Sequence, residues 1–388
     1  MKIVFLSFSD YKGGASIAAH TIFKSIKSKN SFFLTVYNKF KGSIGIYNTF
    51  QKIHIFNLRI LEKILIYFFN QKKYHQSLNI FGTFIKTKIS SFSPNIINIH
   101  WINRSMISLK ELNSFKEKLI ISMHDMWFIN PTEHYSEDKI IKKSFLSNYC
   151  WKQKIKLLYK KNVYFIVHNR WMFNKFVKRH PSLRKKIYIS KYYPIKTDIF
   201  KPRNKIPLRK KYDIPIKKKI ILFSAQDIKD ERKGFSYFTK IIKKLSKNEE
   251  FFFISIGKKK PNFKDSNNYK HIDFFNNIKT SEFYSLSDIY ICTSLIDNLP
   301  LTILEALSSG NLVISFKNGG AEEVLKKIGY TFKFNEFNKM INRIENLDKK
   351  TIEKKSKLSR EFALKNLRFK NTKSRYLRIF NKIHKLKN

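Results

Sequence analysis

The chain has 388 residues, of which 43% are hydrophobic and 15% are aromatic. This length is enough for two domains with separate cores, and the apolar content excludes a disordered chain. The two cysteines, Cys150 and Cys292, stand far apart, which excludes a disulfide framework and a cysteine-based metal spacing and fits a reducing cytoplasm. The most apolar stretch, residues 60–69, is broken by Glu62 and Lys63 and is too short to span a bilayer. We therefore expect a soluble chain.

Basic residues outnumber acidic residues by 78 to 28, which gives a formal net charge of +50. Such a charge points toward a polyanionic partner such as nucleic acid. However, the excess is spread along the chain, and no zinc-finger or RNA-binding signature accompanies it. With only 11 glycines and 9 prolines, the composition is also typical of an AT-rich genome. Two interpretations therefore stay open: compositional drift, and a surface facing an anionic membrane leaflet, where each nearby Lys or Arg contributes about 1 kcal/mol.

Short apolar runs alternate with helical patterns through the first half of the chain. The predicted strands are residues 2–9, 32–37, 96–100, 119–123 and 164–168. The predicted helices include residues 15–27, 59–70 and 109–118. Strands that alternate with helices indicate an α/β protein with a parallel, doubly wound sheet.

A region with four prolines and dense lysine, residues 191–219, is typical of an interdomain linker. A second alternating series follows, with predicted strands at 219–225, 251–257, 289–293 and 312–316 and helices at 235–246 and 301–308. We therefore expect an N-terminal Rossmann-like domain (1–195), a linker (196–216), a C-terminal Rossmann-like domain (217–365) and a terminal helix that returns to the first domain (366–388). A cleft between two such domains is a usual place for a ligand.

Two kinds of polar segment follow the predicted strands of the first half. Gly13 and Gly14 come after the first strand, where glycine lets the backbone approach a phosphate or a sugar closely. A tight turn between strand and helix explains this pair equally well. The segments His100–Asn103 (HWIN) and His124–Trp127 (HDMW) follow two later strands and should lie at the same edge of the sheet. The dinucleotide fingerprint GxGxxG is absent, which argues against a nicotinamide enzyme.

The segment Glu231–Gly234 (ERKG) lies between the first strand of the second half and the next helix. The planar guanidinium of Arg232 and the point charge of Lys233 both suit a diphosphate whose charge grows as it leaves. Hydrogen bonds to charged groups contribute about 1.5–3 kcal/mol each, so two of them would stabilise a leaving group substantially. A solvated basic turn in a lysine-rich protein is the alternative.

The segment Asp297–Gly310 (DNLPLTILEALSSG) places an acid in a loop, a proline at a predicted helix start and a second acid, Glu305, inside the helix. A helix that begins near Pro300 has unpaired amides in its first turn and attracts anions such as phosphate. Those amides would belong to Leu301, Thr302 and Ile303. Glu305 lies about one turn further in, where a carboxylate can accept two hydroxyl hydrogen bonds, as from a ribose. The segment predicts a nucleotide or nucleotide-sugar site, and an acidic loop before an ordinary amphipathic helix is the alternative.

These motifs together resemble those of the retaining glycosyltransferases of family 4. The family signature is an acid, seven residues, then Glu-Ala and a nearby glycine, which corresponds here to Asp297 and Glu305. Lys233 and Gly234 match the family's phosphate-binding position, and the HWxN and HDMW segments resemble one subgroup. The family more often has Glu at position 297 and an arginine near Ala225, so this chain departs from the pattern at two places. The resemblance covers nearly the whole chain and implies the GT-B fold, two Rossmann-like domains with a cleft between them.

The resemblance also implies a role for each site residue. Arg232 and Lys233 would neutralise the departing diphosphate, Glu305 would hold the ribose, and His124 would contact the sugar from the first domain. Asp297 would orient the sugar together with the amides of Asn298 and Leu299. The remaining donor-binding residues would be Gly13, Gly14, Leu301 and Thr302. No DxD pair stands at a strand end, so no metal and no cofactor are expected.

The activity implied is retaining transfer of a sugar from a nucleotide-sugar to a saccharide or lipid-linked saccharide. The setting would be surface polysaccharide synthesis (capsule, O-antigen or lipopolysaccharide) in the cytoplasm, peripheral on the inner membrane face, with no specific nucleic acid as partner. The variable residues 35–93 would form the acceptor region. Two alternatives stay open: a basic, non-catalytic protein that binds nucleic acid or anionic lipid, and a sugar epimerase or phosphorylase on the same fold.

Overall fold

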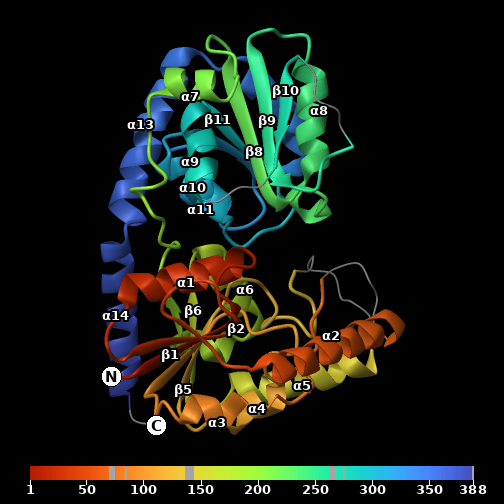
Figure 1. Cartoon of the computed structure of the whole chain (residues 1–388), viewed down its shortest axis with the longest axis vertical. Helices are drawn as coiled ribbons and strands as arrows, with labels where there is room; N and C mark the ends of the chain where they lie inside the picture. Colours follow the sequence, from red (N-terminus) through yellow and green to blue (C-terminus); the bar gives the residue numbers. More distant parts are fainter. Residues whose placement is uncertain (70–74, 84, 136–143, 263–266, 274–276, 387–388) are drawn as a thin grey trace. The chain divides into compact units, whose positions relative to one another are not determined.

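The computed structural model describes residues 1–69, 75–83, 85–135, 144–262, 267–273 and 277–386. The chain divides into two compact units (Figure 1). Unit 1 comprises residues 1–191 and 372–388, and unit 2 comprises residues 192–371. The chain therefore enters unit 2 once and returns to unit 1 through its C-terminal helix. This division falls four residues before the expected end of the first domain, and it assigns the whole predicted linker to unit 2.

Unit 1 is built on a parallel sheet in the order β3-β2-β1-β4-β5-β6-β7. Its strands are β1 (Ile3–Ser9), β2 (Ser31–Tyr37), β3 (Ser43–Gly45), β4 (Ile96–Ile99), β5 (Lys118–Ser122), β6 (Val163–Val167) and β7 (Ile187–Ile189). Every residue of β1, β4, β5 and β6 is buried, as expected for strands with helices on both faces. The strand order reverses between β1 and β4, and ligands of doubly wound sheets bind at such a point.

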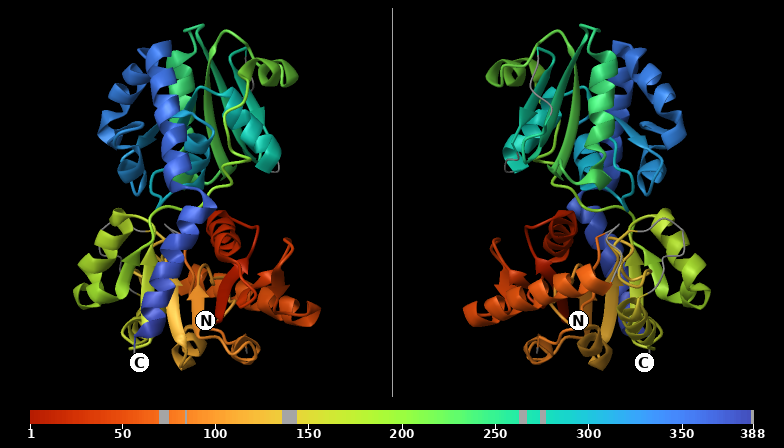
Figure 2. Two further views of the ribbon diagram at one scale, coloured as in Figure 1. Left: turned by 90° about the vertical axis from the view of Figure 1, so that its left-hand side faces the viewer. Right: turned by 90° about the vertical axis from the view of Figure 1, so that its right-hand side faces the viewer.

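Helices cover both faces of this sheet (Figure 2). They are α1 (Gly14–Ile26), α2 (Thr49–Phe69), α3 (Ile85–Ser90), α4 (Leu109–Ser114), α5 (Phe145–Leu158), α6 (Arg170–Arg179) and α14 (Phe369–Lys385). A short 3-10 helix, Pro181–Lys186, precedes β7. Helix α14 packs on β1 through Phe380, whose ring centroid lies 6.1 Å from that of Phe5. The terminal helix is therefore an integral part of the unit 1 core.

Unit 2 repeats the architecture with a parallel sheet in the order β10-β9-β8-β11-β12-β13. Its strands are β8 (Lys219–Asp227), β9 (Phe251–Lys258), β10 (Tyr269–Ile272), β11 (Ile289–Cys292), β12 (Leu312–Phe316) and β13 (Tyr330–Phe332). Its helices are α7 (Lys205–Lys211), α8 (Phe235–Leu245), α9 (Asn277–Leu286), α10 (Leu301–Ser308), α11 (Ala321–Leu325), α12 (Phe337–Glu345) and α13 (Lys349–Asn366). Two short 3-10 helices, Glu231–Lys233 and Phe334–Glu336, complete it. Here the strand order reverses between β8 and β11.

The two doubly wound units confirm the expected fold class. The helix expected at residues 109–118 is shorter, because α4 ends at Ser114 and Lys118 already begins β5. The buried ammonium of Lys118 donates to the carbonyl oxygens of Ile383 (3.2 Å) and His384 (2.9 Å) at the end of α14. A cation is favourable at a helix C-terminus, which explains why this lysine lies inside the fold.

Three findings bear on the composition-based expectations. Both cysteines are free thiols inside the protein. Among the described helices, none combines the length and the apolar character needed to cross a bilayer. Helix α2 begins at Thr49, ten residues before the helix expected at 59, and it contains the apolar stretch that Glu62 interrupts.

Candidate active site

The candidate site of unit 2 lies where its strand order reverses. Strands β8 and β11 are neighbours in the sheet, and the chain leaves them on opposite sides. The loops after these two strands contain residues 231–234 and 293–300, the segments singled out in the sequence. Loops at such a reversal diverge and leave room for a ligand. The topology thus places the two predicted segments at one point of one sheet.

Hydrogen bonds to backbone carbonyl oxygens join these two loops. The amide of Leu295 donates to the carbonyl oxygen of Arg232 (2.7 Å), and the hydroxyl of Thr293 donates to that of Gly234 (2.8 Å). Gly234 has φ +68°, and a Cβ atom there would lie 2.0 Å from the carbonyl oxygen of Thr293. Only glycine fits both the left-handed conformation and this close approach. Gly234, which matches the family's phosphate-binding position, is therefore required for joining the two loops.

A third loop, after β12, is attached to the second one. The amide of Asp297 donates to the carbonyl oxygen of Asn318 (3.2 Å), and the amide of Gly320 donates to that of Asn298 (2.7 Å). A Cβ atom on Gly319 would lie 1.7 Å from the carbonyl oxygen of Asp297. Three strand-end loops thus form one hydrogen-bonded layer at the carboxyl edge of the sheet.

The charged side chains of this layer are paired with one another. Lys233 Nζ donates to Asp297 Oδ2 (2.7 Å), and Arg232 Nη1 donates to the same oxygen (3.0 Å). Arg232 also donates to Asp230 Oδ2 (3.1 Å) and to the carbonyl oxygen of Ile296 (3.2 Å). Burial opposes ionisation of Asp297, but the charges of Lys233 and Arg232 outweigh it and lower the pKa of Asp297. Two cations and two carboxylates therefore form a neutral cluster, in which the side chains of Arg232 and Lys233 are 30% and 24% exposed.

The helix predicted to bind an anion starts as expected. Pro300 is the N-cap of α10, which runs from Leu301 to Ser308. The amide of Ile303 donates to the carbonyl oxygen of Pro300 (3.2 Å), so one of the three amides predicted to be unpaired is already bonded. The first-turn amides of Leu301 and Thr302 remain the candidates for a ligand. The preceding side chains of Asn298 and Leu299 are buried, so those residues could offer a ligand only their backbone.

Glu305 belongs to a separate hydrogen-bond chain inside unit 2. The hydroxyl of Tyr284, on α9, donates to Glu305 Oε2 (3.3 Å) and lies 2.7 Å from the hydroxyl of Ser224 on β8. Burial raises the pKa of Glu305 to about 7, against a smaller lowering by the hydrogen bond from Tyr284. The sequence did not single out Tyr284 or Ser224, because nothing distinguishes them from other core residues of a helix and a strand.

The glycine pair of unit 1 lies at the corresponding reversal of its own sheet. Gly13 is the N-cap of α1 with φ +91°, and Gly14 is the first residue of that helix. The loop is fixed by the buried Asp10, whose carboxylate accepts the amides of Lys39 (3.0 Å) and Phe40 (2.9 Å) after β2. Gly13 thus allows the turn into α1, and Asp10, which the sequence did not single out, fixes its position.

The HWIN and HDMW segments meet at the ends of β4 and β5. His100 Nδ1 and His124 Nε2 share a hydrogen bond of 2.8 Å, and the indole of Trp101 donates to Asp125 Oδ2 (3.2 Å). The ring of His168, at the end of β6, stacks on His124 with a centroid distance of 5.4 Å. Burial lowers the pKa of His124 to about 4. Burial and the neighbouring His124 also lower the pKa values of His100 and His168, so the row of three histidines is neutral near pH 7.

The structure therefore brings some predicted residues together and places others apart. Arg232, Lys233 and Asp297 are in direct contact, whereas Glu305 is linked to β8 through Tyr284. His124, Gly13 and Gly14 belong to unit 1. In the described residues, no group of three or more His, Cys, Asp or Glu side chains could hold a metal ion, and a metal-free reaction stays a prediction.

Comparisons with known proteins found one matching family model and several similar solved structures. Residues 204–362 match the family model of glycosyl transferases group 1. Among curated proteins, no sequence matches the chain. The structure is similar to a glycosyltransferase from Rickettsia africae, with 17% identity, a TM-score of 0.68, and 100% of this chain and 99% of that chain covered.

Two further solved structures are similar over almost their whole length. One is Alr3699/HepE from Anabaena in complex with UDP, with 14% identity, a TM-score of 0.68, and 98% and 100% of the two chains covered. The same Anabaena protein is also known in complex with UDP-glucose. The other is WaaG, a glycosyltransferase involved in lipopolysaccharide biosynthesis, with 11% identity, a TM-score of 0.65, and 97% and 99% covered. At these identities the similarities show the fold, and the expected pair of GT-B units is confirmed.

The turn at Gly234 gives a first prediction. Gly234→Ala should lower the free energy of unfolding of unit 2 by at least about 1–2 kcal/mol, because a side chain is strained at this φ and meets Thr293. Gly82→Ala is the matched control, since its Cβ would meet only Glu111 Oε2 at 3.8 Å. Urea unfolding followed by circular dichroism measures both, and equal midpoints for the two variants would contradict this account.

The raised pKa of Glu305 gives a second prediction. The unfolded carboxyl ionises near its ordinary pKa, and the folded one ionises near 7. Wild-type stability therefore falls as the pH rises between these values, and the cost of ionising the half-buried group is fully present above pH 7. Glu305→Gln should raise the Tm at pH 8 by about 2–4 °C, or about 1 kcal/mol for a unit of this size, and by less at pH 5. Differential scanning calorimetry at both pH values checks this, and a gain that is larger at pH 5 would refute it.

The neutral histidine row gives a third prediction with the opposite sign. The unfolded His124 takes up a proton below its ordinary pKa, whereas the folded one does so only near pH 4. Unit 1 therefore loses stability as the pH falls through this range, by at most about 1.4 kcal/mol per pH unit for one such group. His124→Asn should make the decline shallower, and His54→Asn, at an exposed position on α2, should not. Urea midpoints between pH 7 and pH 4.5 measure the slopes, and parallel slopes for wild type and His124→Asn would contradict the prediction.

Proposed function

We propose that this chain, whose residues 204–362 match the family model of glycosyl transferases group 1, is a retaining enzyme that moves a sugar from a nucleotide-sugar to a saccharide hydroxyl. The observation that carries the proposal is the position of Arg232 and Lys233, which lie together at the strand reversal of unit 2. A cationic pair at such a point suits the diphosphate of a donor. The complexes of the Anabaena protein with UDP and UDP-glucose support a donor of this class.

In the proposed reaction, the bond between the sugar's anomeric carbon and the diphosphate oxygen breaks. A new bond forms on the same face to the acceptor oxygen, and the acceptor's proton passes to the departing diphosphate. Arg232 and Lys233 would hold the negative charge that develops on the diphosphate. Because both already bind Asp297, the arriving phosphate would share them with that carboxylate. Asp297 would then be released from part of its pairing and could accept a hydroxyl of the sugar.

Glu305 would accept the ribose hydroxyls, and this role requires its ionised form. Its pKa of about 7 means that the empty site holds a substantial protonated fraction at neutral pH. Two hydroxyl donors would favour the carboxylate and lower that pKa. Donor binding would therefore release a proton, and donor affinity would rise with pH through the region around pH 7.

The acceptor would bind to unit 1, in the region of residues 35–93, and His124 would contact the donor sugar from that unit. We propose a saccharide or lipid-linked saccharide as acceptor, in surface polysaccharide synthesis on the cytoplasmic face of a membrane. The similarity to WaaG, which acts in lipopolysaccharide biosynthesis, supports this setting. The net charge of +50 supports contact with an anionic lipid surface.

The fourth prediction tests the donor site. Lys233→Ala and Glu305→Ala should each reduce turnover of the nucleotide-sugar at least a hundredfold, through loss of charge stabilisation and of the ribose contact. Lys229→Ala, at an exposed position in the same loop, is the matched control and should retain activity. The donor is first found by thermal stabilisation with a panel of UDP-, GDP- and ADP-sugars, since a ligand at a hundred times its Kd adds about 2.7 kcal/mol.

Circular dichroism of each variant separates loss of function from loss of fold. Full turnover in both Lys233→Ala and Glu305→Ala would remove the site assignment. Release of free epimerised sugar without an acceptor would instead identify an epimerase, and formation of sugar phosphate with inorganic phosphate as the only acceptor would identify a phosphorylase.

A further inference from the structure

Helix α2 exposes an unusual amount of apolar surface. It runs from Thr49 to Phe69, about 30 Å at 1.5 Å per residue. Nine of its large hydrophobic side chains are more than 40% exposed: Phe50, Ile53, Phe56, Ile60, Leu61, Ile64, Tyr67, Phe68 and Phe69. Scattered exposed apolar residues are normal, but a continuous row along one helix marks an interaction surface.

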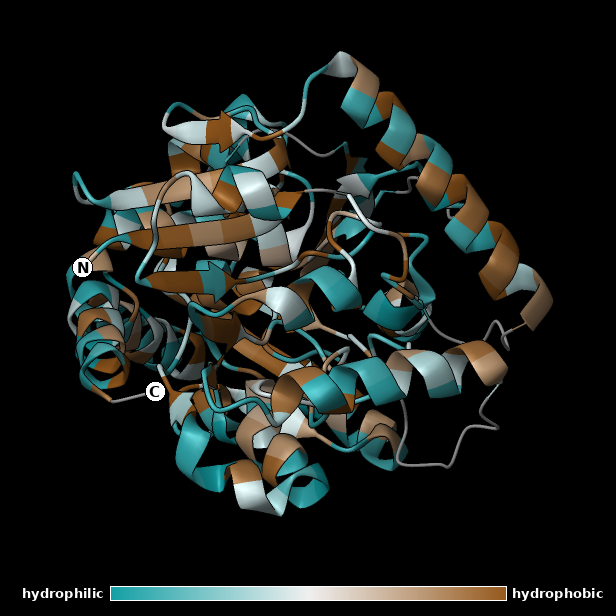
Figure 3. Cartoon of the chain, turned by 90° about the horizontal axis from the view of Figure 1, so that it is seen from below, coloured by the Kyte–Doolittle hydropathy of each residue, from teal (hydrophilic) through white to brown (hydrophobic). Residues whose placement is uncertain are grey.

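Eight of these side chains, all except Phe69, lie on one side of the helix, which we call the outer face. Ile53, Ile60 and Tyr67 are spaced by seven residues and therefore lie along one line. At 100° per residue, Phe56 lies to one side of this line and Ile64 to the other, and the outer face covers an arc of roughly 140°. Figure 3 shows how apolar segments recur along α2. The helix is thus amphipathic with its apolar side turned away from unit 1.

A buried carboxylate fixes this orientation. The two buried side chains of α2 are Ile55 and Glu62, on the side opposite the outer face. Glu62 Oε1 accepts the amide of Leu78 (2.5 Å), and Oε2 accepts the hydroxyl of Ser105 (2.5 Å). Rotating the helix to bury its apolar side would leave these donors without their acceptor in the interior, at a cost of about 1–3 kcal/mol each. The hydrogen bonds of Glu62 therefore hold α2 with its apolar side facing outward.

The charges of the helix indicate what covers this face. The basic residues of α2 are Lys52, Arg59 and Lys63, and its one acid, Glu62, points inward. The chain as a whole carries a net charge of +50. A second copy would bring an equal positive charge to the contact, whereas an anionic lipid surface would attract both the helix and the chain. Charge complementarity thus favours a lipid surface over a second copy.

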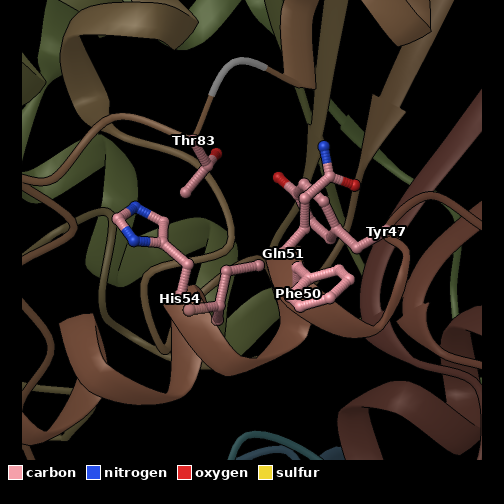
Figure 4. A pocket seen from close by; sticks show the side chains of 6 residues that line it. Tyr47, Phe50, Gln51, His54 and Thr83 are labelled. Carbon is pink, nitrogen blue, oxygen red and sulfur yellow. The ribbon is translucent and has the colours of Figure 1, made fainter.

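A recess adjoins the first turns of the helix (Figure 4). It has a volume of about 250 Å³ and is lined by Tyr47, Phe50, Gln51, His54, Ile55 and Thr83. Figure 4 shows the rings of Tyr47 and Phe50 on one side of the recess and His54 on the other. Phe50, the most exposed of the nine apolar side chains, forms part of its wall. The recess therefore opens beside the N-terminal end of the outer face.

We propose that α2 lies flat in the headgroup region of an anionic bilayer, with its outer face among the lipid chains. This inference deepens the membrane contact of the proposed function by naming the surface that makes it. The helix rests in the interface and does not span the membrane, since its inner side is packed on unit 1 through Ile55 and Glu62. A lipid-linked acceptor would then lie at the same bilayer surface as residues 35–93, the region proposed to bind it.

Vesicle flotation of the full chain tests the proposal. The probes are vesicles of phosphatidylcholine and vesicles of phosphatidylcholine and phosphatidylglycerol in equal parts. The test variant carries Ile53→Ser, Ile60→Ser and Ile64→Ser, whose side chains are 54%, 44% and 46% exposed. The control carries Ile206→Ser, Ile216→Ser and Ile278→Ser in unit 2, which are 51%, 43% and 60% exposed. The two triples match in chemistry, number and exposure.

We expect wild type and the control to float with the anionic vesicles, and the test variant to partition at least about tenfold less. Wild type should bind phosphatidylcholine vesicles more weakly. Wild type that ignores anionic vesicles, or a test variant that binds them as wild type does, would overturn the proposal. So would a wild-type dimer, seen by light scattering, that the test variant alone converts to monomers while its flotation is unchanged.

Donor binding is measured on the same samples to keep the two proposals apart. Nucleotide-sugar should raise the Tm of the test variant as much as that of wild type, because none of the three substituted residues is among the proposed donor-binding residues. Loss of flotation with intact donor stabilisation supports the role of α2. Intact flotation without any donor effect would contradict the glycosyltransferase proposal and leave the membrane helix standing.

Discussion

The candidate site of unit 2 depends on one ionic contact, in which Asp297 accepts hydrogen bonds from both Arg232 and Lys233. Each group is largely removed from water, and an isolated charge there would cost several kcal/mol. The three charges are tolerable because they lie together and because Asp230 and the carbonyl oxygen of Ile296 complete the coordination of Arg232. The contact also links the side chains of the loops after β8 and β11. A ligand that binds there must replace part of this pairing with its own negative charge.

The same constraint explains why small residues recur around the cluster. The loops approach so closely that a Cβ atom at Gly234 or Gly319 would overlap a backbone oxygen. Backbone hydrogen bonds between the loops satisfy groups that would otherwise be unpaired at the end of a buried sheet. The rigidity of the site therefore comes from main-chain contacts, and its chemistry comes from a few side chains on top of them. Such preorganisation keeps the cations close together before a donor arrives.

The sequence predicted the central elements well and the edges poorly. Strands such as β1 and β12 are entirely buried and mostly apolar, and α10 has the bounds that Pro300 and the apolar pattern indicated. The edge strands β3, β7, β10 and β13 have three or four residues and are partly exposed, so they carry too little periodicity to be recognised. The pairing of Lys233 with Asp297 spans 64 residues and follows from topology. The hydrogen bond from Tyr284 to Glu305 could not be predicted from the sequence, because an aromatic residue in a helix is ordinarily a core residue.

The inward position of Glu62 has a consequence for how the rest of α2 can vary. An interior side chain must match the shape of its neighbours, and small changes in volume are felt there. The apolar side chains of the outer face are each more than 40% exposed, so the surrounding residues constrain their shape less. Phenylalanine, leucine and isoleucine could therefore replace one another along the outer face with little effect on folding, as long as the total apolar surface area is kept. Glu62 would then fix the orientation of α2, while the residues of its outer face could change among apolar types.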